Sequence, residues 1–345
     1  APIKLKAIGR RRQPRDAAAR GCLRILSVTM HRSAALILVL LASIAAEAMS
    51  RAESTPDFYY DPGDEMIEAE RLPGDDNYQG DVVSIGHALG AWLEFVPGLG
   101  DRIWVGERTD QWQRRTAAVG YGAHARPTLT VDAQGRLWLS YETSRDGQWD
   151  VFAVRLAGGK PAGETVNISS SRRADLNHVV AADSHGNLWF AWQADRDGQY
   201  DIVARKFSSD GLQDVETVCQ EPHGQWHPAI ACAGNRVHVA WDGYNGADFD
   251  VAMCTRSRDA WGAVERITNT PAFEGRVDLA VDRQDRLWIA WEEGAENWGR
   301  PFVGIDTLSF GDQQGPLHRF RTVRVAIRDA SRVSRLEDPF PMPSS

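Results

Sequence analysis

The amino-acid sequence predicts an all-β protein, a β-propeller of about five four-stranded antiparallel blades. Three observations support this fold class. The chain is rich in glycine (31) and tryptophan (13), a composition that favours turns and strands. A pattern of about 50 residues recurs five times. The central strand of each copy is apolar on both faces, as in Leu188-Trp189-Phe190-Ala191-Trp192, so both faces must be buried. Sheets packed face to face around an axis satisfy all three observations.

Composition and charge limit the possible functions. Of the 345 residues, 43% are hydrophobic and 25% are charged, which predicts a packed core and excludes a wholly disordered, collagen-like or disulfide-dense chain. The first 48 residues hold nine basic and two acidic side chains. This leaves 30 basic and 45 acidic ones in residues 49–345, a net charge of −15. An acidic body argues against nucleic acid or an anionic membrane as the partner.

The N-terminal region reads as a targeting signal. The first methionine is Met30, and we expect residues 1–29 to be sequence upstream of the true start. Residues 30–48 combine a basic start, the apolar run Ala34–Ala46 and an Ala-Glu-Ala cleavage site, which is typical of a signal peptide. The run is shorter than the ~20 residues that span a bilayer. We therefore expect a secreted or periplasmic protein with no membrane span after signal removal. Residues 49–74 are expected to be a linker between the signal peptide and the propeller.

Aromatic residues define the repeat, and we expect them to occupy equivalent buried positions in successive blades. They are Trp92, Tyr141, Trp192, Trp241 and Trp291, separated by 49, 51, 49 and 50 residues. Nine residues after each of the first four stands an aspartate, and Arg300 takes this place in the fifth copy. These aspartates are Asp101, Asp150, Asp201 and Asp250.

A residue that occurs once per blade is expected to be structural, and we assign these aspartates to accepting backbone N–H bonds at strand entrances. A ring of metal ligands is the alternative. Blades related by rotation would hold the four carboxylates too far apart for one ion, so we predict no metal site. The sequence also predicts no cofactor, because it contains no phosphate-binding glycine loop and no dinucleotide-binding pattern.

The strands of the second copy are predicted at Thr128–Val131, Leu137–Tyr141, Asp150–Leu156 and about Thr165–Ile168. By extension the propeller covers residues 75–315. Residues 316–345 then contain a last strand, Leu317–Ile327, as the outer strand of the fifth blade, and a proline-rich linker. If the sequence is a fragment of a longer protein, the blade count rises to six or more.

One rim of the propeller is the expected binding surface, because the loops that enter the inner strands and those that leave the second strands meet there. The ligand-binding candidates on this rim are Arg126, Arg172, Asn177, Trp226, His227, Arg276, Glu142, Asp242 and Glu292. Converging arginines, carboxylates and an aromatic ring suit a sugar or a carboxylate ligand. The alternative is a solvated rim of turn-forming polar residues.

The segments Pro127–Trp138 and Arg145–Ala153 resemble secreted bacterial propellers of the sialidase-like, aspartate-box-related superfamily. The resemblance covers about residues 75–315 and implies the architecture. Two departures concern activity. The segments Ser144–Trp149 and Ser208–Gly211 do not match the aspartate box Ser-x-Asp-x-Gly-x-Thr-Trp. The Phe/Tyr-Arg-Ile-Pro motif, which supplies the first arginine of a sialidase, is absent.

Two functions follow from the sequence. The first is a monomeric, secreted binding module that recognises a glycan or a protein on one rim. The alternative is an extracytoplasmic glycoside hydrolase that uses rim carboxylates, which requires a suitably spaced pair with one raised pKa.

Three cysteines remain after signal removal: Cys219, Cys232 and Cys254. We predict no disulfide among them, because the strand assignment places them on different strands, too far apart to be bridged.

Overall fold

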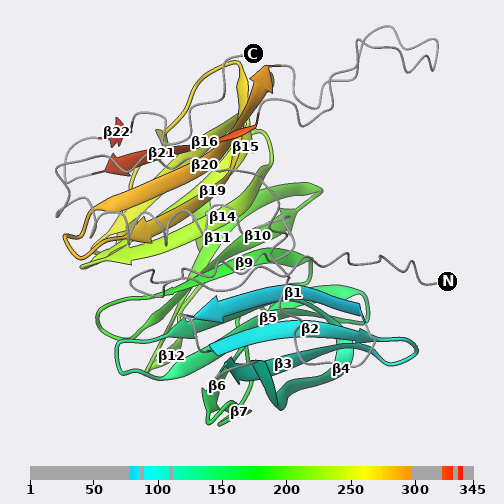
Figure 1. The fold of residues 1–345 in the computed structure, drawn as a ribbon. Coiled ribbons are helices and arrows are strands. Elements are labelled where there is room, and N and C mark those ends of the chain that lie inside the picture. The colour runs from blue at the N-terminus through cyan, green and yellow to red at the C-terminus, as the bar shows by residue number, and fades with distance from the viewer. Residues whose placement is uncertain (1–77, 86–88, 109–111, 297–320, 329–332, 337–345) are drawn as a thin grey trace, which may run out of the picture.

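The computed structural model describes residues 78–85, 89–108, 112–296, 321–328 and 333–336 (Figure 1). These residues form strands and turns, with no helix among them. In this part of the chain no helix is available that could span a membrane. The upstream extension, signal peptide and linker predicted for residues 1–74 lie outside the described residues.

Five blades follow one another in chain order, and Figure 1 shows the sheets stacked from the blue strands to the red ones. Blade 1 contains β1 (Tyr78–Ile85), β2 (Leu89–Val96), β3 (Gly100–Arg108) and the first part of β4 (Trp112–Val131). Blade 2 contains the rest of β4, β5 (Leu137–Arg145), β6 (Gln148–Ala157), β7 (Lys160–Pro161) and β8 (Val166–Asn167). Blade 3 contains β9 (Asp175–Ala182), β10 (Leu188–Arg196), β11 (Gln199–Ser208), β12 (Gly211–Leu212) and β13 (Glu216–Cys219). Blade 4 contains β14 (Gln225–Ala233), β15 (Arg236–Tyr244), β16 (Phe249–Ser257), β17 (Ala260–Trp261) and β18 (Glu265–Arg266). Blade 5 contains β19 (Ala272–Val281), β20 (Leu287–Glu296), β21 (Thr322–Arg328) and β22 (Val333–Arg335).

The predicted architecture is confirmed: each blade is an antiparallel meander of four strand positions. Two details differ from the sequence prediction. The outer position of blades 2, 3 and 4 is divided between two short strands, both paired with the third strand. In blade 5, the strand predicted as the outer one is the third, since β21 pairs with β20 from Leu287↔Arg328 to Glu293↔Thr322. The outer strand is β22.

Strand β4 belongs to two blades. Its first half pairs with β3, between Arg108↔Trp112 and Asp101↔Gly122, and its second half pairs with β5 from Ala123↔Ser144 onward. The sequence predicted an inner strand of only four residues here, Thr128–Val131. Residues 116–125 contain no proline and no turn dipeptide, so nothing interrupts the extended backbone.

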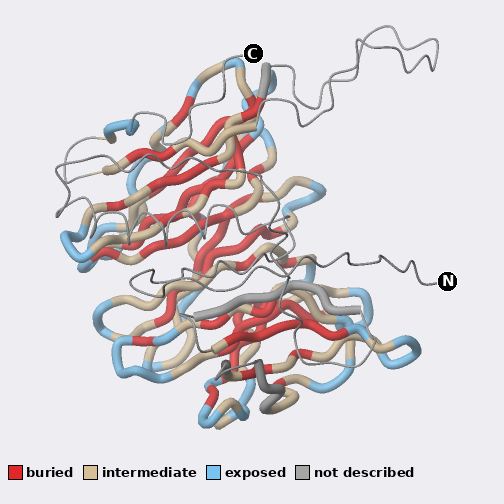
Figure 2. Tube along the Cα trace, viewed as in Figure 1, coloured by how far each residue is buried: buried red, intermediate tan, exposed pale blue. Residues whose placement is uncertain are grey.

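The core lies between the blades rather than inside any one of them. Four hydrophobic clusters are each built from two neighbouring blades. Strand β10 illustrates the arrangement: Phe190 and Trp192 pack with Val151 of blade 2, whereas Trp189 and Ala191 pack with Val239 of blade 4. Figure 2 shows the buried residues along the middle of the strands and the exposed ones at the turns.

The five repeat aromatics are buried as predicted. Trp92, Tyr141, Trp192, Trp241 and Trp291 are at most 5% exposed. Four of the five share the role expected of equivalent positions, since Tyr141, Trp192, Trp241 and Trp291 lie in clusters shared by adjacent blades.

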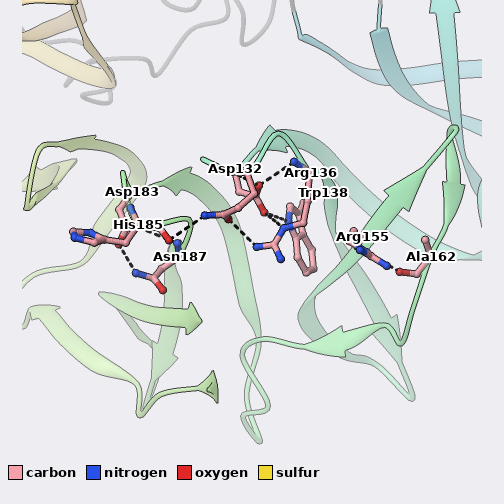
Figure 3. A network of polar contacts seen from close by, with 9 residues as sticks. Asp132, Arg136, Trp138, Arg155, Ala162, Asp183, His185 and Asn187 are labelled. Atoms are coloured by element: carbon pink, nitrogen blue, oxygen red, sulfur yellow. Dashed lines mark hydrogen bonds and ion pairs between the residues drawn. The ribbon is translucent and has the colours of Figure 1, made fainter. Parts of the chain in front are cut away.

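A second set of aspartates closes the hairpins between the inner and second strands, at the rim opposite the predicted binding surface. Figure 3 shows two of them, Asp132 and Asp183. Asp132 accepts hydrogen bonds from the backbone N–H groups of Gln134 (3.0 Å) and Arg136 (2.9 Å) and from Trp138 Nε1 (2.9 Å). Asp183 and Asp282 repeat this arrangement. The side chain of Gln134 also donates to the carbonyl of His185, which connects blade 2 to blade 3.

Replacing Asp183 by alanine should lower the free energy of unfolding by about 1–3 kcal/mol, because the backbone N–H groups of His185 and Asn187 and the indole N–H of Trp189 lose their acceptor. Denaturant unfolding would measure the loss, with Asp210→Ala, at an exposed turn, as the control.

The pH dependence provides a second measurement. Desolvation raises the pKa of Asp183, but hydrogen bonds from Asn187, His185 and Trp189 outweigh it and hold the pKa below its ordinary value. The ionised carboxylate therefore stabilises the fold above the unfolded pKa of ~3.9, and this contribution is lost as the pH falls through the folded pKa. The stability difference between wild type and Asp183→Ala should shrink in acid; a difference that is constant between pH 7 and pH 3 would contradict this role.

The cysteines confirm the prediction that no disulfide forms. Cys219, Cys232 and Cys254 are free thiols, on the outer strand of blade 3 and on the inner and third strands of blade 4. Burial raises the pKa of both Cys219 and Cys232 to about 12.

Because the thiolate is the reactive form, neither Cys219 nor Cys232 should react with an alkylating reagent at pH 8 in the folded protein. Peptide mass spectrometry after labelling should find both modified only when denaturant is present. Modification of either in the native protein, at the rate of a small-molecule thiol, would contradict the buried position.

Candidate ligand-binding site

The inner strands carry a bulge at the candidate rim, with one residue in the left-handed conformation in each of blades 2 to 5. These residues are Arg126 (φ 50°), Asn177 (φ 56°), His227 (φ 48°) and Arg276 (φ 53°). The strand pairing shifts register at or next to each of them. Non-glycine residues avoid this conformation, at a cost of about 1–3 kcal/mol each. The four bulges place one side chain per blade at the rim where the sequence analysis expected a ligand to bind.

Each bulge residue contacts the polar residue that follows the repeat aromatic on the second strand of its own blade. Arg126 Nε lies 3.3 Å from Glu142 Oε1, and His227 Nδ1 lies 3.0 Å from Asp242 Oδ2. The other two pairs follow the same pattern. Asn177 donates to Gln193, and Arg276 Nη1 lies 3.3 Å from both carboxylate oxygens of Glu292. We call these four contacts the rim pairs. Seven of the nine predicted ligand-binding candidates belong to them.

The acceptors of the rim pairs also join neighbouring blades. Glu142 accepts the backbone N–H of His178 (2.9 Å), Gln193 that of His227 (3.0 Å) and Asp242 that of Arg276 (3.2 Å). The acceptor of one blade is therefore held by the inner strand of the next, which fixes the position of both residues in the pair.

Exposure separates the two members of each charged pair. The side chains of Arg126, His227 and Arg276 are 22%, 42% and 38% exposed, against 2% for Glu142, 4% for Asp242 and 20% for Glu292. A ligand on this rim would meet mainly N–H groups, with the carboxylates behind them. A third guanidinium, that of Arg321, lies 3.2 Å from Glu292.

An aromatic cluster lies beside the His227–Asp242 pair. Phe249 is the centre, with ring centroids 5.5 Å from Trp226, 5.4 Å from Tyr244 and 5.6 Å from Phe273. Trp226 pairs with Asp242 in the ladder and is half-buried, and Tyr244 is 37% exposed. A Cβ on Gly224 would lie 2.7 Å from the Trp226 ring, so this glycine gives the indole room to lie against the backbone.

Trp226 was a sequence candidate, whereas Tyr244 was not. Its signal was its place two residues after Asp242, on the loop side of the second strand. Arg172, the remaining candidate, is exposed in the loop before β9. Its neighbour Arg173 makes ion pairs with Asp195 and Asp197 instead.

Glu142 of the Arg126–Glu142 pair also belongs to a chain of hydrogen bonds that runs through an imidazole to a hydroxyl. His178 Nε2 lies 3.0 Å from Ser140 Oγ, and His178 Nδ1 lies 3.0 Å from Glu142 Oε1. This order of groups is the one used in nucleophilic catalysis. Ser140, His178 and Glu142 are only 1–2% exposed, however, so a substrate cannot reach the hydroxyl. The chain of hydrogen bonds connects blades 2 and 3, and the sequence analysis missed it.

The recurrent aspartates of the third strands lie at the same rim, but two of them reach the backbone through a hydroxyl rather than directly. Ser169 Oγ accepts the N–H of Val151 (3.0 Å) and lies 3.2 Å from Asp150 Oδ1 as a donor. Thr268 forms the same link between Val251 and Asp250. Asp101 does accept a backbone N–H, from His124 at 3.2 Å, and Asp201 accepts from the side chain of Gln199. Of the four described carboxylates, Asp101 is the one seen to accept a backbone N–H directly, as predicted for all of them.

The described residues contain no group of three or more His, Cys, Asp or Glu side chains that could hold a metal ion.

Asp150→Ala should lower the free energy of unfolding by about 1–3 kcal/mol, because Ser169 and Asn167 lose their acceptor. A double-mutant cycle with Ser169→Ala should give a double variant less destabilised than the sum of the single variants, since both changes break one chain of hydrogen bonds. Ligand binding should survive in folded protein. Normal stability combined with lost binding would refute the structural assignment of Asp150.

Comparison with known proteins gives similarity of fold only. No family model matches the sequence, and no curated protein matches it. Among solved structures, an ulvan lyase is 12% identical, with 78% of this chain and 74% of that chain covered and a TM-score of 0.51. A thermostable family-43 glycoside hydrolase is 11% identical, with 76% and 93% covered and a TM-score of 0.45. An endo-1,4-β-xylanase from Bacteroides thetaiotaomicron is 11% identical, with 72% and 90% covered and a TM-score of 0.41.

Proposed function

We propose that the protein is a glycan-binding β-propeller whose ligand occupies the rim formed by the four rim pairs and the Trp226–Tyr244 aromatic cluster. The observation that carries the proposal is the pairing itself. At each position a donor contacts an acceptor. The guanidinium groups of Arg126, Arg276 and Arg321 face the carboxylates of Glu142 and Glu292, and the imidazole of His227 faces that of Asp242. The N–H groups are the more exposed members of these pairs and can donate hydrogen bonds to sugar hydroxyls, while the carboxylates behind them neutralise their charge.

The aromatic cluster supplies the second element of the proposal. Exposed aromatic rings bury apolar area at low entropic cost and recur at binding surfaces, where a polar rim surrounds them. Tyr244 and Trp226 give such an apolar surface directly beside His227. The apolar C–H face of a pyranose ring would lie against it while its hydroxyls reach the rim pairs. The ulvan lyase of similar fold is named for its action on a polysaccharide, and the present proposal concerns a glycan as well.

The setting of the proposal is the one expected from the sequence. The signal segment at residues 30–48 would export the protein to the periplasm or the medium, where it would act as a monomer. It would belong to the sialidase-like propellers in architecture without their catalytic motifs.

Glycoside hydrolysis is the second candidate, and a single observation favours it. Burial raises the pKa of Asp278 to about 6, and its side chain is partly exposed on the inner strand of blade 5. This is the protonation behaviour expected of a general acid. Burial also raises the pKa of Asp175 and of Glu274, but these carboxyls are 1% and 0% exposed, out of reach of a substrate. Binding without turnover therefore has the broader support.

Trp226→Ala and Tyr244→Ala should each weaken glycan binding by about tenfold or more, because truncating a buried aromatic anchor typically costs at least 1.4–2 kcal/mol of binding energy. A glycan array on the exported protein would identify the ligand, and titration calorimetry would measure the change in Kd.

The matched control is Trp261→Ala, a half-buried tryptophan at the opposite end of blade 4. It should leave the Kd unchanged. A turnover assay on the bound glycan, with Asp278→Asn as the test variant, separates the two candidates. Hydrolysis that disappears in Asp278→Asn would replace the binding proposal, and unchanged Kd values in folded Trp226→Ala and Tyr244→Ala would place the ligand elsewhere.

A further inference from the structure

The residues two positions before each bulge lie on the inner strands of blades 2 to 5, at the same rim as the recurrent aspartates. From blade 2 to blade 5 they are His124, Asp175, Gln225 and Glu274. The last three are 1%, 1% and 0% exposed. The charge of Asp150 acts on Asp175, and that of Asp250 acts on Glu274. Two of the four interfaces between blades thus bury one carboxyl group beside another.

The hydrogen bonds around these two pairs leave one oxygen without a donor in each. Asp150 and Asp250 have both oxygens bonded, by Asn167 and Ser169 and by Asn245 and Thr268. Asp175 Oδ1 accepts from Trp192 Nε1 (2.8 Å), and Glu274 Oε1 accepts from Thr270 (2.8 Å). Asp175 Oδ2 and Glu274 Oε2 are buried and have no hydrogen-bond partner among the described residues. A buried carboxylate oxygen in this state is costly, which indicates that something occupies the place.

The other two interfaces decide between a cation and a proton. Where blade 3 has Asp175 and blade 5 has Glu274, blade 4 has Gln225 and blade 2 has His124. A glutamine has nearly the shape of a protonated glutamate and brings no charge, and a site built for a cation would lose half of its charge with this replacement. A position that accepts an acid, an amide or an imidazole is suited to a neutral side chain that can donate a hydrogen bond.

We propose that the pairs Asp150–Asp175 and Asp250–Glu274 are proton-binding sites, each holding one proton, so that the interfaces of blades 2 and 3 and of blades 4 and 5 loosen when that proton is lost. The proposal is independent of the glycan site.

The groups that face each pair favour one bound proton, because they do not neutralise the two carboxylates. Around Asp175, on β9, these are Asp150 on β6, the hydroxyls of Ser169 and Ser171, and Trp192 on β10. Around Glu274, on β19, they are Asp250 on β16, the hydroxyls of Thr268 and Thr270, and Glu293 on β20. Glu293 is itself paired with Arg324 and Arg335. No cation directly neutralises either pair among these neighbours.

The sign of the pH effect follows from the direction of the pKa. Burial, with a smaller contribution from the facing carboxylate, raises the pKa of Asp175 and of Glu274 above the unfolded values of ~3.9 and ~4.3. Between the unfolded and folded pKa the native protein holds more protons than the unfolded chain. Stability is therefore present at low pH and is lost as the pH rises through the folded pKa, at up to tenfold in the unfolding equilibrium constant per pH unit and per proton.

The experiment compares denaturant unfolding between pH 5 and pH 9 in the full chain. The wild type should lose stability as the pH rises, and Asp175→Asn and Glu274→Gln should each flatten this dependence by up to one proton. Gln225→Glu is the matched gain-of-carboxyl variant, because it places a buried carboxyl at the equivalent position of blade 4 and should steepen the dependence by up to one proton. Asp278→Asn removes the contribution of that carboxyl, whose pKa is about 6, from the background.

Infrared spectroscopy gives a readout that does not depend on the stability of a variant. In the Asp278→Asn chain, the carbonyl band of a neutral carboxylic acid should persist as the pH rises above the ordinary pKa of exposed carboxyl groups, and it should weaken when Asp175→Asn or Glu274→Gln is added. If these variants do not fold, the carbonyl band of the unaltered pairs and the pH dependence of unfolding of Gln225→Glu still test the proposal. A wild-type profile that is flat and lacks the band, or an unfolding midpoint that rises with calcium in wild type but not in Asp175→Asn and Glu274→Gln, would overturn the proposal.

Discussion

Each second strand has to bury both of its faces, and the rest of the structure depends on this constraint. A strand such as β10 presents Phe190 and Trp192 to one side and Trp189 and Ala191 to the other. A single sheet cannot cover both sides, so the preceding and following blades must do so. The apolar contacts therefore lie between blades, along the middle of the strands. Polar groups are confined to the strand ends, where the two rims carry different sets of residues.

The polar residues of the two rims have different roles. At the hairpin rim, Asp132, Asp183 and Asp282 close one turn after another in the same way, and the repetition is structural. At the opposite rim, each of blades 2 to 5 keeps the same backbone bulge but carries a different pair of side chains. The same backbone positions hold Arg126 with Glu142 in blade 2 and His227 with Asp242 in blade 4. Constant backbone with variable side chains is the arrangement expected where a propeller presents a specific surface.

Much of the fold was predictable because its cause is periodic. The aromatic spacing placed the second strands and the buried positions, and the strand order then placed Cys219, Cys232 and Cys254 apart. The long strand β4 was not predicted, because a strand that changes partners halfway leaves no local signal in the sequence. The site was predictable only in part. Glu142 and Arg126 were both candidates, but their contact depends on a bulge that shifts the register of the strand pairing. No residue type in the sequence indicates that bulge. His178 and Tyr244 were missed because their roles arise from neighbouring strands rather than from spacing along the chain.

Strand β4 has a consequence for how the molecule folds. Stacked repeats usually behave as units coupled to their nearest neighbours, and each unit is separated from the next by a loop. Blades 1 and 2 have no such loop, since one strand of 20 residues, bulged at Arg126, hydrogen-bonds to both. Neither can unravel without exposing the edge of the other. We therefore expect these two blades to unfold together, whereas blades 3, 4 and 5 are joined to their neighbours by loops.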